Sequence, residues 1–336
     1  MPEPLLEVYA ISKRFPVKKG LVFKKTIGEV HAVTNVSFSI NKKETLALVG
    51  ESGSGKTTIG RIVGGLLKPT SGKIVLDGND ISQLRKDELR KLQQKIGVVF
   101  QDPHASLNPR KRIADVISEP LAIHRWKTER ERFERVKELL RKVGLSRSAA
   151  LKYPHQFSGG QLQRIAIARA LALEPSLIVA DEPVSALDVS VQAKIMNLLY
   201  EIQRDTGVSY LLISHDLGVV RQISHKVLVL YLGYVVESAE AEDFFSKPQH
   251  PYSQALLSSV LVPDVDTMKS NPPKLLSGEI PSPLTLPIGC KFNTRCPYVQ
   301  ERCKLEEPIL TSSSSTHSVS CFFWGEIEHG GILPKT

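Results

Sequence analysis

The sequence predicts an α/β protein in which helices cover a parallel β-sheet. Continuous apolar runs, typical of strands that are buried on both faces, occur at Leu46–Val49, Leu177–Ala180 and Val208–Ser214. Residues 57–67 and Val189–Asp205 carry helical patterns between or after these runs. The alternation of such strands with helices argues for a parallel sheet with helices on its faces.

The composition is that of an ordinary globular protein. The chain has 336 residues, enough for roughly two domains, and 41% of them are hydrophobic. Its longest apolar run, Val227–Val236, is far shorter than the roughly 18–20 residues of a bilayer span. The N-terminus lacks the pattern of a secretory signal. We therefore expect a cytoplasmic chain that reaches a membrane only through a partner.

The charge balance is basic, with 44 lysines and arginines against 35 acidic residues and a formal net charge of +9. Such a balance is compatible with nucleic acid, an anionic lipid surface or a polyphosphate ligand. The densest basic cluster, between Lys13 and Lys25, is interpreted first as a solvated hairpin. Charge alone does not choose among these partners.

A phosphate-binding loop is predicted at Gly50–Thr57, because GESGSGKT fits the pattern G-x-x-x-x-G-K-[ST] between a strand and a helix. Glycines let successive backbone N–H groups point at phosphate oxygens, and the helix N-terminus adds its positive end. Lys56 is expected at the β- and γ-phosphates, and the Thr57 hydroxyl at Mg²⁺. A glycine-rich structural turn is the alternative. The residues predicted to contact nucleotide are Gly50, Ser52, Gly53, Gly55, Lys56, Thr57 and Thr58.

Two acids follow the apolar strand Leu177–Ala180. A carboxylate at the carboxyl end of a parallel strand points into the ligand crevice. We expect Asp181 to support Mg²⁺ and Glu182 to act as the general base that polarises the attacking water. A helix cap is the alternative interpretation of such a pair.

A second anion site is predicted at Phe157–Gln161, where a serine and two glycines precede a helix. This segment, FSGGQ, resembles the signature motif of ABC ATPases, with Phe157 in place of the usual leucine. The resemblance implies a P-loop NTPase fold of the ABC type, with an antiparallel β subdomain and a helical subdomain. It also implies that Ser158, Gly159, Gly160 and Gln161 cover a nucleotide held by the loop of an opposing subunit.

Further segments resemble ABC ATPase motifs in the expected order. Gln101 is similar to the glutamine that contacts Mg²⁺ and the attacking water, and His215 to the histidine that holds the γ-phosphate. Asp188 lies in a segment similar to the one that crosses the dimer interface. Phe15 is similar in position to the aromatic residue that stacks on adenine. The resemblance thus implies catalytic roles for Glu182, His215 and Gln101.

The resemblance places a nucleotide-binding domain at 1–240, with a helical subdomain inserted at about 102–165. A helical and proline-rich connection is expected at 241–289, and a small Cys-rich C-terminal domain at 290–336. Within that tail, the serine-rich stretch 311–316 is expected to be a flexible loop.

The whole chain resembles the ATP-binding subunits of oligopeptide and dipeptide importers, notably at Phe100–Arg110, His250–Leu256 and Gly278–Pro283. This implies a paralogous ATPase partner or a homodimer, two membrane permeases, an external substrate-binding protein and a place on the cytoplasmic face of the membrane. No nucleic-acid partner is expected. A soluble ABC ATPase of nucleic-acid repair or translation is the alternative function, and an export ATPase is disfavoured.

The only four cysteines of the chain lie in the C-terminal tail, 290–336: Cys290, Cys296, Cys303 and Cys321. Disulfides are unexpected in a reducing cytosol. Four thiolates in a segment poor in apolar residues suit a metal or an iron–sulfur cluster, which would add folding energy. The resemblance to peptide-importer ATPases implies a [4Fe-4S] cluster. A Zn²⁺ site and free buried thiols are the alternatives.

Overall fold

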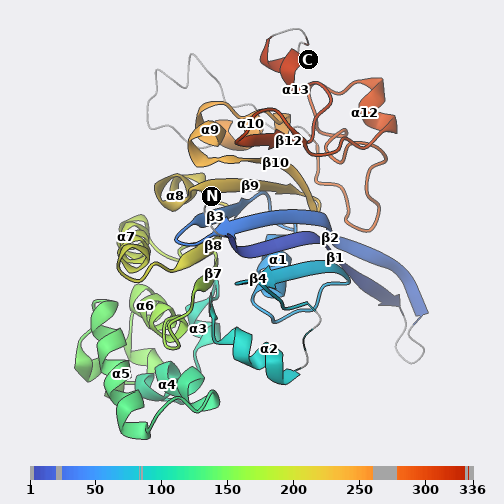
Figure 1. The fold of residues 1–336 in the computed structure, drawn as a ribbon. Helices are drawn as coiled ribbons and strands as arrows, with labels where there is room; N and C mark the ends of the chain where they lie inside the picture. Colours follow the sequence, from blue (N-terminus) through green and yellow to red (C-terminus); the bar gives the residue numbers. More distant parts are fainter. Residues whose placement is uncertain are drawn as a thin grey trace.

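The computed structural model describes residues 4–19, 25–82, 84, 86–259, 278–329 and 332. Their strands form a four-stranded antiparallel sheet and an eight-stranded mixed sheet (Figure 1). The first has the order β2-β1-β4-β5, from β1 (Pro4–Lys19), β2 (Lys25–Asn41), β4 (Ser71–Leu76) and β5 (Asn79–Asp80). The second has the order β11-β12-β10-β9-β3-β8-β7-β6, from β11 (Thr311–Ser312), β12 (His317–Val319), β10 (Tyr234–Glu240), β9 (Lys226–Tyr231), β3 (Thr45–Val49), β8 (Ser209–Ile213), β7 (Leu177–Asp181) and β6 (Ile96–Val99).

Parallel pairing runs through the centre of the large sheet. β9, β3, β8, β7 and β6 are parallel neighbours, and every residue of β3, β7 and β8 is buried. This confirms the parallel sheet predicted from the continuous apolar runs. Since parallel strands end at the same edge, the segments that follow β3, β6, β7 and β8 are brought together there.

Helices cover both faces of this sheet. α1 (Lys56–Val63) is sandwiched between the sheets, where Ile59 and Ile62 are buried with Leu6 and Ile40 of the antiparallel sheet and with Ile213 of β8. The remaining crossover helices are α6 (Gly159–Ala170), α7 (Val189–Thr206) and α8 (Leu217–Ile223).

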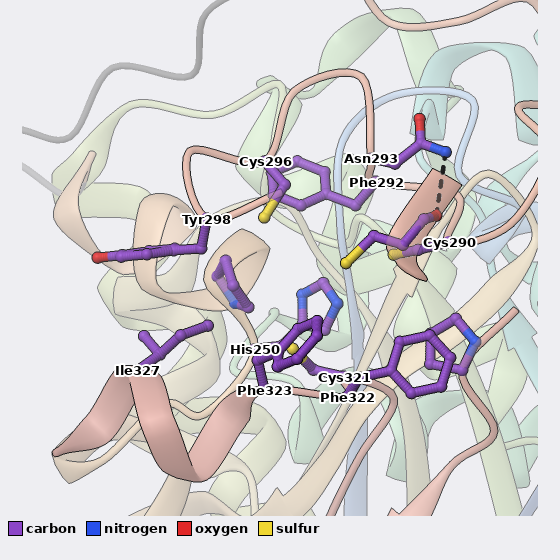
Figure 2. Close-up of a pocket in the computed structure, with 13 residues that line it drawn as sticks. His250, Cys290, Phe292, Asn293, Cys296, Tyr298, Cys321, Phe322, Phe323 and Ile327 are labelled. Atoms are coloured by element: carbon purple, nitrogen blue, oxygen red, sulfur yellow. Dashed lines mark hydrogen bonds between the residues drawn. The ribbon is translucent and has the colours of Figure 1, made fainter. Parts of the chain in front are cut away.

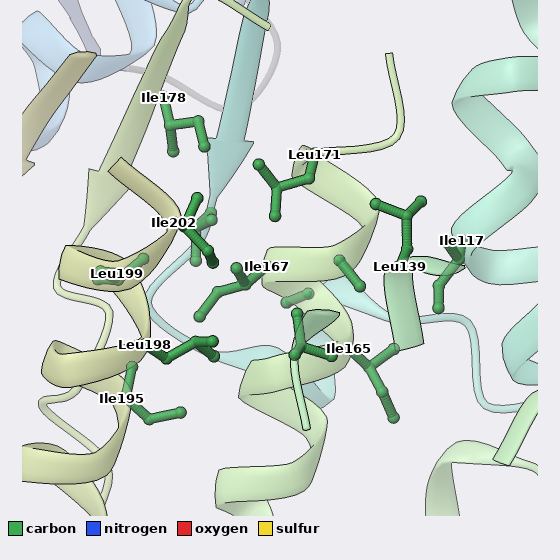
Figure 3. Close-up of a cluster of buried hydrophobic side chains, with 14 of the residues drawn as sticks. Ile117, Leu139, Ile165, Ile167, Leu171, Ile178, Ile195, Leu198, Leu199 and Ile202 are labelled. Atoms are coloured by element: carbon green, nitrogen blue, oxygen red, sulfur yellow. The ribbon is translucent and has the colours of Figure 1, made fainter. Parts of the chain in front are cut away.

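A mostly helical part projects from the large sheet, as the sequence predicted (Figure 1). Its own core contains Ile117 and Leu139, and Ile165 of α6 and Ile202 of α7 join it to the sheet (Figure 3). A capping box at Thr128 starts its longest helix, since the Thr128 hydroxyl and the Glu131 carboxylate satisfy each other's backbone N–H groups. The elements are α2 (Lys86–Gln93), α3 (Pro103–Ser106), α4 (Ile113–Ile123), α5 (Glu129–Lys142) and the 3₁₀ turns Arg147–Leu151 and Pro154–Gln156.

The C-terminal segments pack against the other end of the large sheet (Figure 1). Their core contains the buried rings of Tyr231, Phe244, Tyr252 and Phe292. β12 pairs with β10 and thereby extends the large sheet, so the separate small Cys-rich domain that we expected is not shown. The helices of this region are α9 (Ala241–Ser246), α10 (Pro251–Ser258), α12 (Glu301–Leu305) and α13 (Trp324–Glu328).

Two of the sequence expectations fall in this region. The stretch 311–316, expected as a flexible loop, contains β11 and pairs with β12. The proline-rich connection lies largely outside the described residues, which resume at 278. Among the helices of the described residues, none combines the length and apolarity that crossing a membrane requires.

Candidate active site

The predicted phosphate loop joins β3 to α1 and has a backbone that only glycine permits at two positions. Gly50 has a φ of 145°, and a Cβ there would lie 2.2 Å from the Leu230 carbonyl oxygen. Gly55 has a φ of 104°, and its Cβ would lie 2.4 Å from the Ala32 oxygen. Side chains at either position would therefore force the loop away from the neighbouring strands.

Lys56 is buried at the base of this loop. Its Nζ donates to the carbonyl oxygens of Gly50 at 2.6 Å and Glu51 at 2.9 Å. Burial lowers the pKa of the Lys56 ammonium, while the carboxylates of Glu182, Asp181 and Glu51 act in the opposite direction. The side chain is a buried cation whose acceptors are loop carbonyls, which anionic phosphate oxygens can replace.

Thr57 and Asp181 form a pair of oxygen donors beside the loop. The Thr57 hydroxyl donates to the Asp181 carboxylate at 3.2 Å. Burial raises the pKa of Asp181, and the Thr57 hydrogen bond opposes this shift. Mg²⁺ prefers hydroxyl and carboxylate oxygens together with substrate phosphates, so this pair fits a magnesium ion.

Glu182 lies where the ends of three strands meet. Its Oε2 accepts from Gln101 Nε2 at 2.6 Å, and its Oε1 lies 3.0 Å from His215 Nδ1. Its φ is 48°, which is unusual for a residue other than glycine, and its N–H donates to the Ile213 oxygen at 2.9 Å. The structure thus brings together Gln101, Glu182 and His215, three residues that lie far apart in the sequence.

Ser158 caps the N-terminus of α6 in the helical part. Ser158 and Gln161 form a capping box, in which the Ser158 N–H donates to Gln161 Oε1 at 3.0 Å. A Cβ on Gly160 would lie 2.5 Å from Val191 Cγ1, so α6 packs closely on α7 at this turn. Among the described residues, no hydrogen bond joins this turn to the phosphate loop of the same chain.

The other predicted contacts lie on either side of these features. Asp188 is exposed at the N-terminus of α7. Phe15 is 37% exposed on β1 and pairs with Val30 of β2. Two residues further along β2, the Ala32 oxygen lies against Gly55 of the phosphate loop. Asp188 and Phe15 are both open to a ligand or a second protein.

Sequence reasoning missed one set of contacts at the loop. Arg295 of the C-terminal tail forms a two-pronged ion pair with Glu51, and the Tyr252 hydroxyl accepts a hydrogen bond from the Glu51 N–H. No local pattern signals a pairing across 244 positions of sequence.

The prediction of an iron–sulfur cluster is wrong, as is the zinc alternative. The four cysteines are free thiols that line one pocket together with aromatic side chains such as Phe292 and Phe323 (Figure 2). In the part of the chain that the structure describes, no group of three or more His, Cys, Asp or Glu side chains is placed to hold a metal ion.

The physical reason lies in the environment of the thiols. Burial raises the pKa of Cys290 to about 11 and those of Cys296 and Cys321 to about 12. Metal ligation requires thiolates. The apolar, aromatic pocket disfavours the thiolate form of Cys290, Cys296 and Cys321, so free buried thiols, the third alternative, fit the structure.

Fold and site together define the class of the protein, a P-loop ATPase. The family model described as "ABC transporter" matches residues 33–185, and that described as "Oligopeptide/dipeptide transporter, C-terminal region" matches residues 236–303. The chain is 50% identical over 323 residues to "Oligopeptide transport ATP-binding protein AppF" of Bacillus subtilis (strain 168), which covers 96% of this chain and 98% of that protein. The chain therefore belongs to the ABC transporter family of ATP-binding proteins, and it is an ATPase.

Further relatives and solved structures agree. "Oligopeptide transport ATP-binding protein OppF" of Escherichia coli (strain K12) is 47% identical, over 94% of this chain and 95% of that protein. A dimeric post-hydrolysis structure of the ATP-binding cassette MJ0796, bound to ADP and Pi, matches with a TM-score of 0.62 at 33% identity. It covers 70% of this chain and 98% of that one. The predicted family and fold core are thereby confirmed.

Proposed function

We propose that this chain is the ATP-hydrolysing subunit that energises an ABC importer for peptides or related solutes. The names of the relatives, and the match to an oligopeptide/dipeptide transporter C-terminal region, support this function. The observation that carries it is the Glu182 carboxylate, held by Gln101 and His215 at the edge of the phosphate loop. The alternative in nucleic-acid repair or translation finds no support among these relatives.

In the proposed reaction, phosphate oxygens bind the loop N–H groups and take the place of the carbonyls at Lys56 Nζ. Thr57 and Asp181 would hold Mg²⁺, which neutralises phosphate charge when bound. Glu182 accepts a proton from water while the water oxygen attacks the γ-phosphorus. The bond between the γ-phosphorus and the oxygen that leaves with ADP breaks. Gln101 and His215 orient the Glu182 carboxylate and contact the water and γ-phosphate.

The second half of the site belongs, in this proposal, to an opposing ATPase subunit. Its serine–glycine turn, the counterpart of Ser158–Gln161, covers the nucleotide held by the glycine loop of this chain. The dimeric MJ0796 cassette with ADP and Pi supports such an arrangement. Asp188 then lies at the dimer interface, and Phe15 stacks on adenine. The opposing subunit is a paralogue or a second copy.

The proposed complex also contains two permeases and an external substrate-binding protein, with this chain at the cytoplasmic face of the membrane. The segment after Gln101 contacts the permeases. Arg169 of α6 donates to the Ser106 oxygen of α3 at 2.6 Å, which supports a mechanical connection between that segment and the helix that begins at the Ser158 turn. Residues 1–240 form the nucleotide-binding unit, with its helical insert at about 102–165, and 241–289 and 290–336 form its C-terminal extension.

Replacement of the proposed base tests this function. Glu182→Gln keeps the shape and the contact with Gln101 but cannot accept a proton. We expect ATP hydrolysis by the assembled transporter to fall by about 10²–10⁴-fold, while ATP still binds. Glu201→Gln, the same change on an exposed residue of α7, is the matched control. An unchanged hydrolysis rate in Glu182→Gln would remove Glu182 from the catalytic role.

A further inference from the structure

The C-terminal tail holds the phosphate loop through one side chain. Arg295 Nη1 donates to Glu51 Oε2 at 2.7 Å, and Nη2 donates to Oε1 at 3.0 Å. The Arg295 side chain is only 5% exposed and that of Glu51 25%. A two-pronged, charge-assisted pair of this kind fixes direction as well as distance, and partial burial protects it from screening by salt.

The backbone of Glu51 is fixed on both sides as well. Its N–H donates to the Tyr252 hydroxyl at 2.7 Å. Its carbonyl oxygen accepts from Lys56 Nζ at 2.9 Å and from the Ser54 N–H at 3.2 Å. The peptide groups on either side of Glu51 therefore have little freedom, and they lead directly into the segment that carries the phosphate-binding N–H groups.

The partners of Glu51 are themselves rigid. The Tyr252 ring is fully buried, with its centroid 4.8 Å from that of Tyr231 and 5.4 Å from that of Phe292. The Arg295 guanidinium lies over the Tyr231 ring at 5.9 Å from its centroid. Such an aromatic cluster holds the hydroxyl and the guanidinium at fixed positions relative to the large sheet.

The contact joins two separately matched segments of the chain. Glu51 lies in the "ABC transporter" match, and Arg295 and Tyr252 lie in the "Oligopeptide/dipeptide transporter, C-terminal region" match. An ion pair that only attached the C-terminal tail to the rest of the chain could lie anywhere on their shared surface. This one acts on the second residue of the phosphate loop.

We propose that Arg295 is a positioning residue for ATP binding, and that the C-terminal region braces the phosphate loop through Glu51. The inference rests on the proposed nucleotide site. Arg295 does not touch the nucleotide. It orients the loop so that its N–H groups already face the phosphates when ATP binds, which favours affinity.

The test measures the ATP dissociation constant and the melting temperature of the purified full chain. We expect Arg295→Gln and Glu51→Gln each to weaken ATP binding by about tenfold. The double variant is expected to bind about as weakly as either single variant, because the two side chains act through each other. Arg295→Lys, which keeps the charge but loses the fork, is expected to bind at an intermediate level.

Two controls separate the possible failures. Lys304→Gln removes an exposed ion pair of the same region and is expected to leave ATP affinity unchanged. Lys56→Ala is expected to weaken binding through direct loss of a phosphate contact.

If wild type and Lys56→Ala bind ATP equally, the nucleotide site itself is misplaced and the proposed function fails. If Lys56→Ala is impaired but Arg295→Gln and Glu51→Gln bind as tightly as Lys304→Gln, only the brace is refuted. Additive losses in the double variant also refute it.

Discussion

His250 shows how one buried side chain ties stability to pH. The ring Nδ1 of His250 accepts from the Tyr252 backbone N–H at 3.1 Å, and the backbone N–H of His250 donates to the buried Glu237 carboxylate at 2.8 Å. Burial lowers the pKa of the His250 ring from 6.5 to about 4, against the attraction of Glu237. The folded chain therefore holds this ring neutral at pH values where the unfolded chain has protonated it.

The sign of the effect follows from proton uptake. Between pH 6.5 and about 4 the unfolded state binds more protons at this site, so the free energy of unfolding decreases as the pH falls. The full effect is up to about 3 kcal/mol. Urea unfolding across this range is expected to show a shallower pH dependence for His250→Asn than for wild type. His104→Asn, on an exposed side chain, should keep the wild-type slope, and an unchanged slope in His250→Asn would contradict the assignment.

At the residue scale, the sequence predicted most residues of the candidate site but not how they are held. The glycine loop and the acids Asp181 and Glu182 follow local patterns that require those residue types. The left-handed backbone of Glu182 and the ion pair between Glu51 and Arg295 depend on segments remote in sequence, so no local pattern reveals them. The cysteine spacing led to a wrong prediction of an iron–sulfur cluster, because spacing does not indicate that aromatic side chains surround the thiols.

At the scale of elements, Gly97 controls how closely α6 approaches the sheet. A Cβ on Gly97 in β6 would lie 2.6 Å from the Ala170 oxygen, at the C-terminal end of α6. Backbone atoms cannot yield as a side chain does, so Gly97→Ala is expected to cost about 1–3 kcal/mol in the free energy of unfolding. Gly325→Ala in α13, where nothing lies within 4 Å of the added atom, is the matched control. Equal stability of the two variants would contradict this packing.

Elements were predicted well where periodicity or apolar continuity is strong. The helix expected at Val189–Asp205 is α7, Val189–Thr206, and the strand expected at Leu177–Ala180 is β7, Leu177–Asp181. The short strands β11 and β12 were missed, because β12 forms on the hydrogen-bonding edge that β10 supplies, and β11 in the serine-rich segment forms on the edge of β12. Pairing of this kind is a tertiary property.

At the scale of the whole molecule, the chain carries two separate turns that we assign to a nucleotide site. The phosphate loop lies where β3 meets α1, and the Ser158 turn begins α6 in the helical part (Figure 1). Each of the two turns offers backbone N–H donors at the N-terminus of a helix. The two helices, α1 and α6, lie in different parts of the same chain. In the proposed assembly, a second ATPase subunit that faces the first brings the complementary parts to one triphosphate, so that closure depends on ATP.

The most direct test is a cryo-EM structure of the assembled transporter that carries Glu182→Gln, determined with ATP bound. We expect the triphosphate to lie between the Gly50–Thr57 loop of this chain and a serine–glycine turn of the facing ATPase subunit. Nucleotide that contacts a single subunit in the closed, ATP-bound assembly, with the facing turn remote from it, would contradict a nucleotide site shared between two subunits.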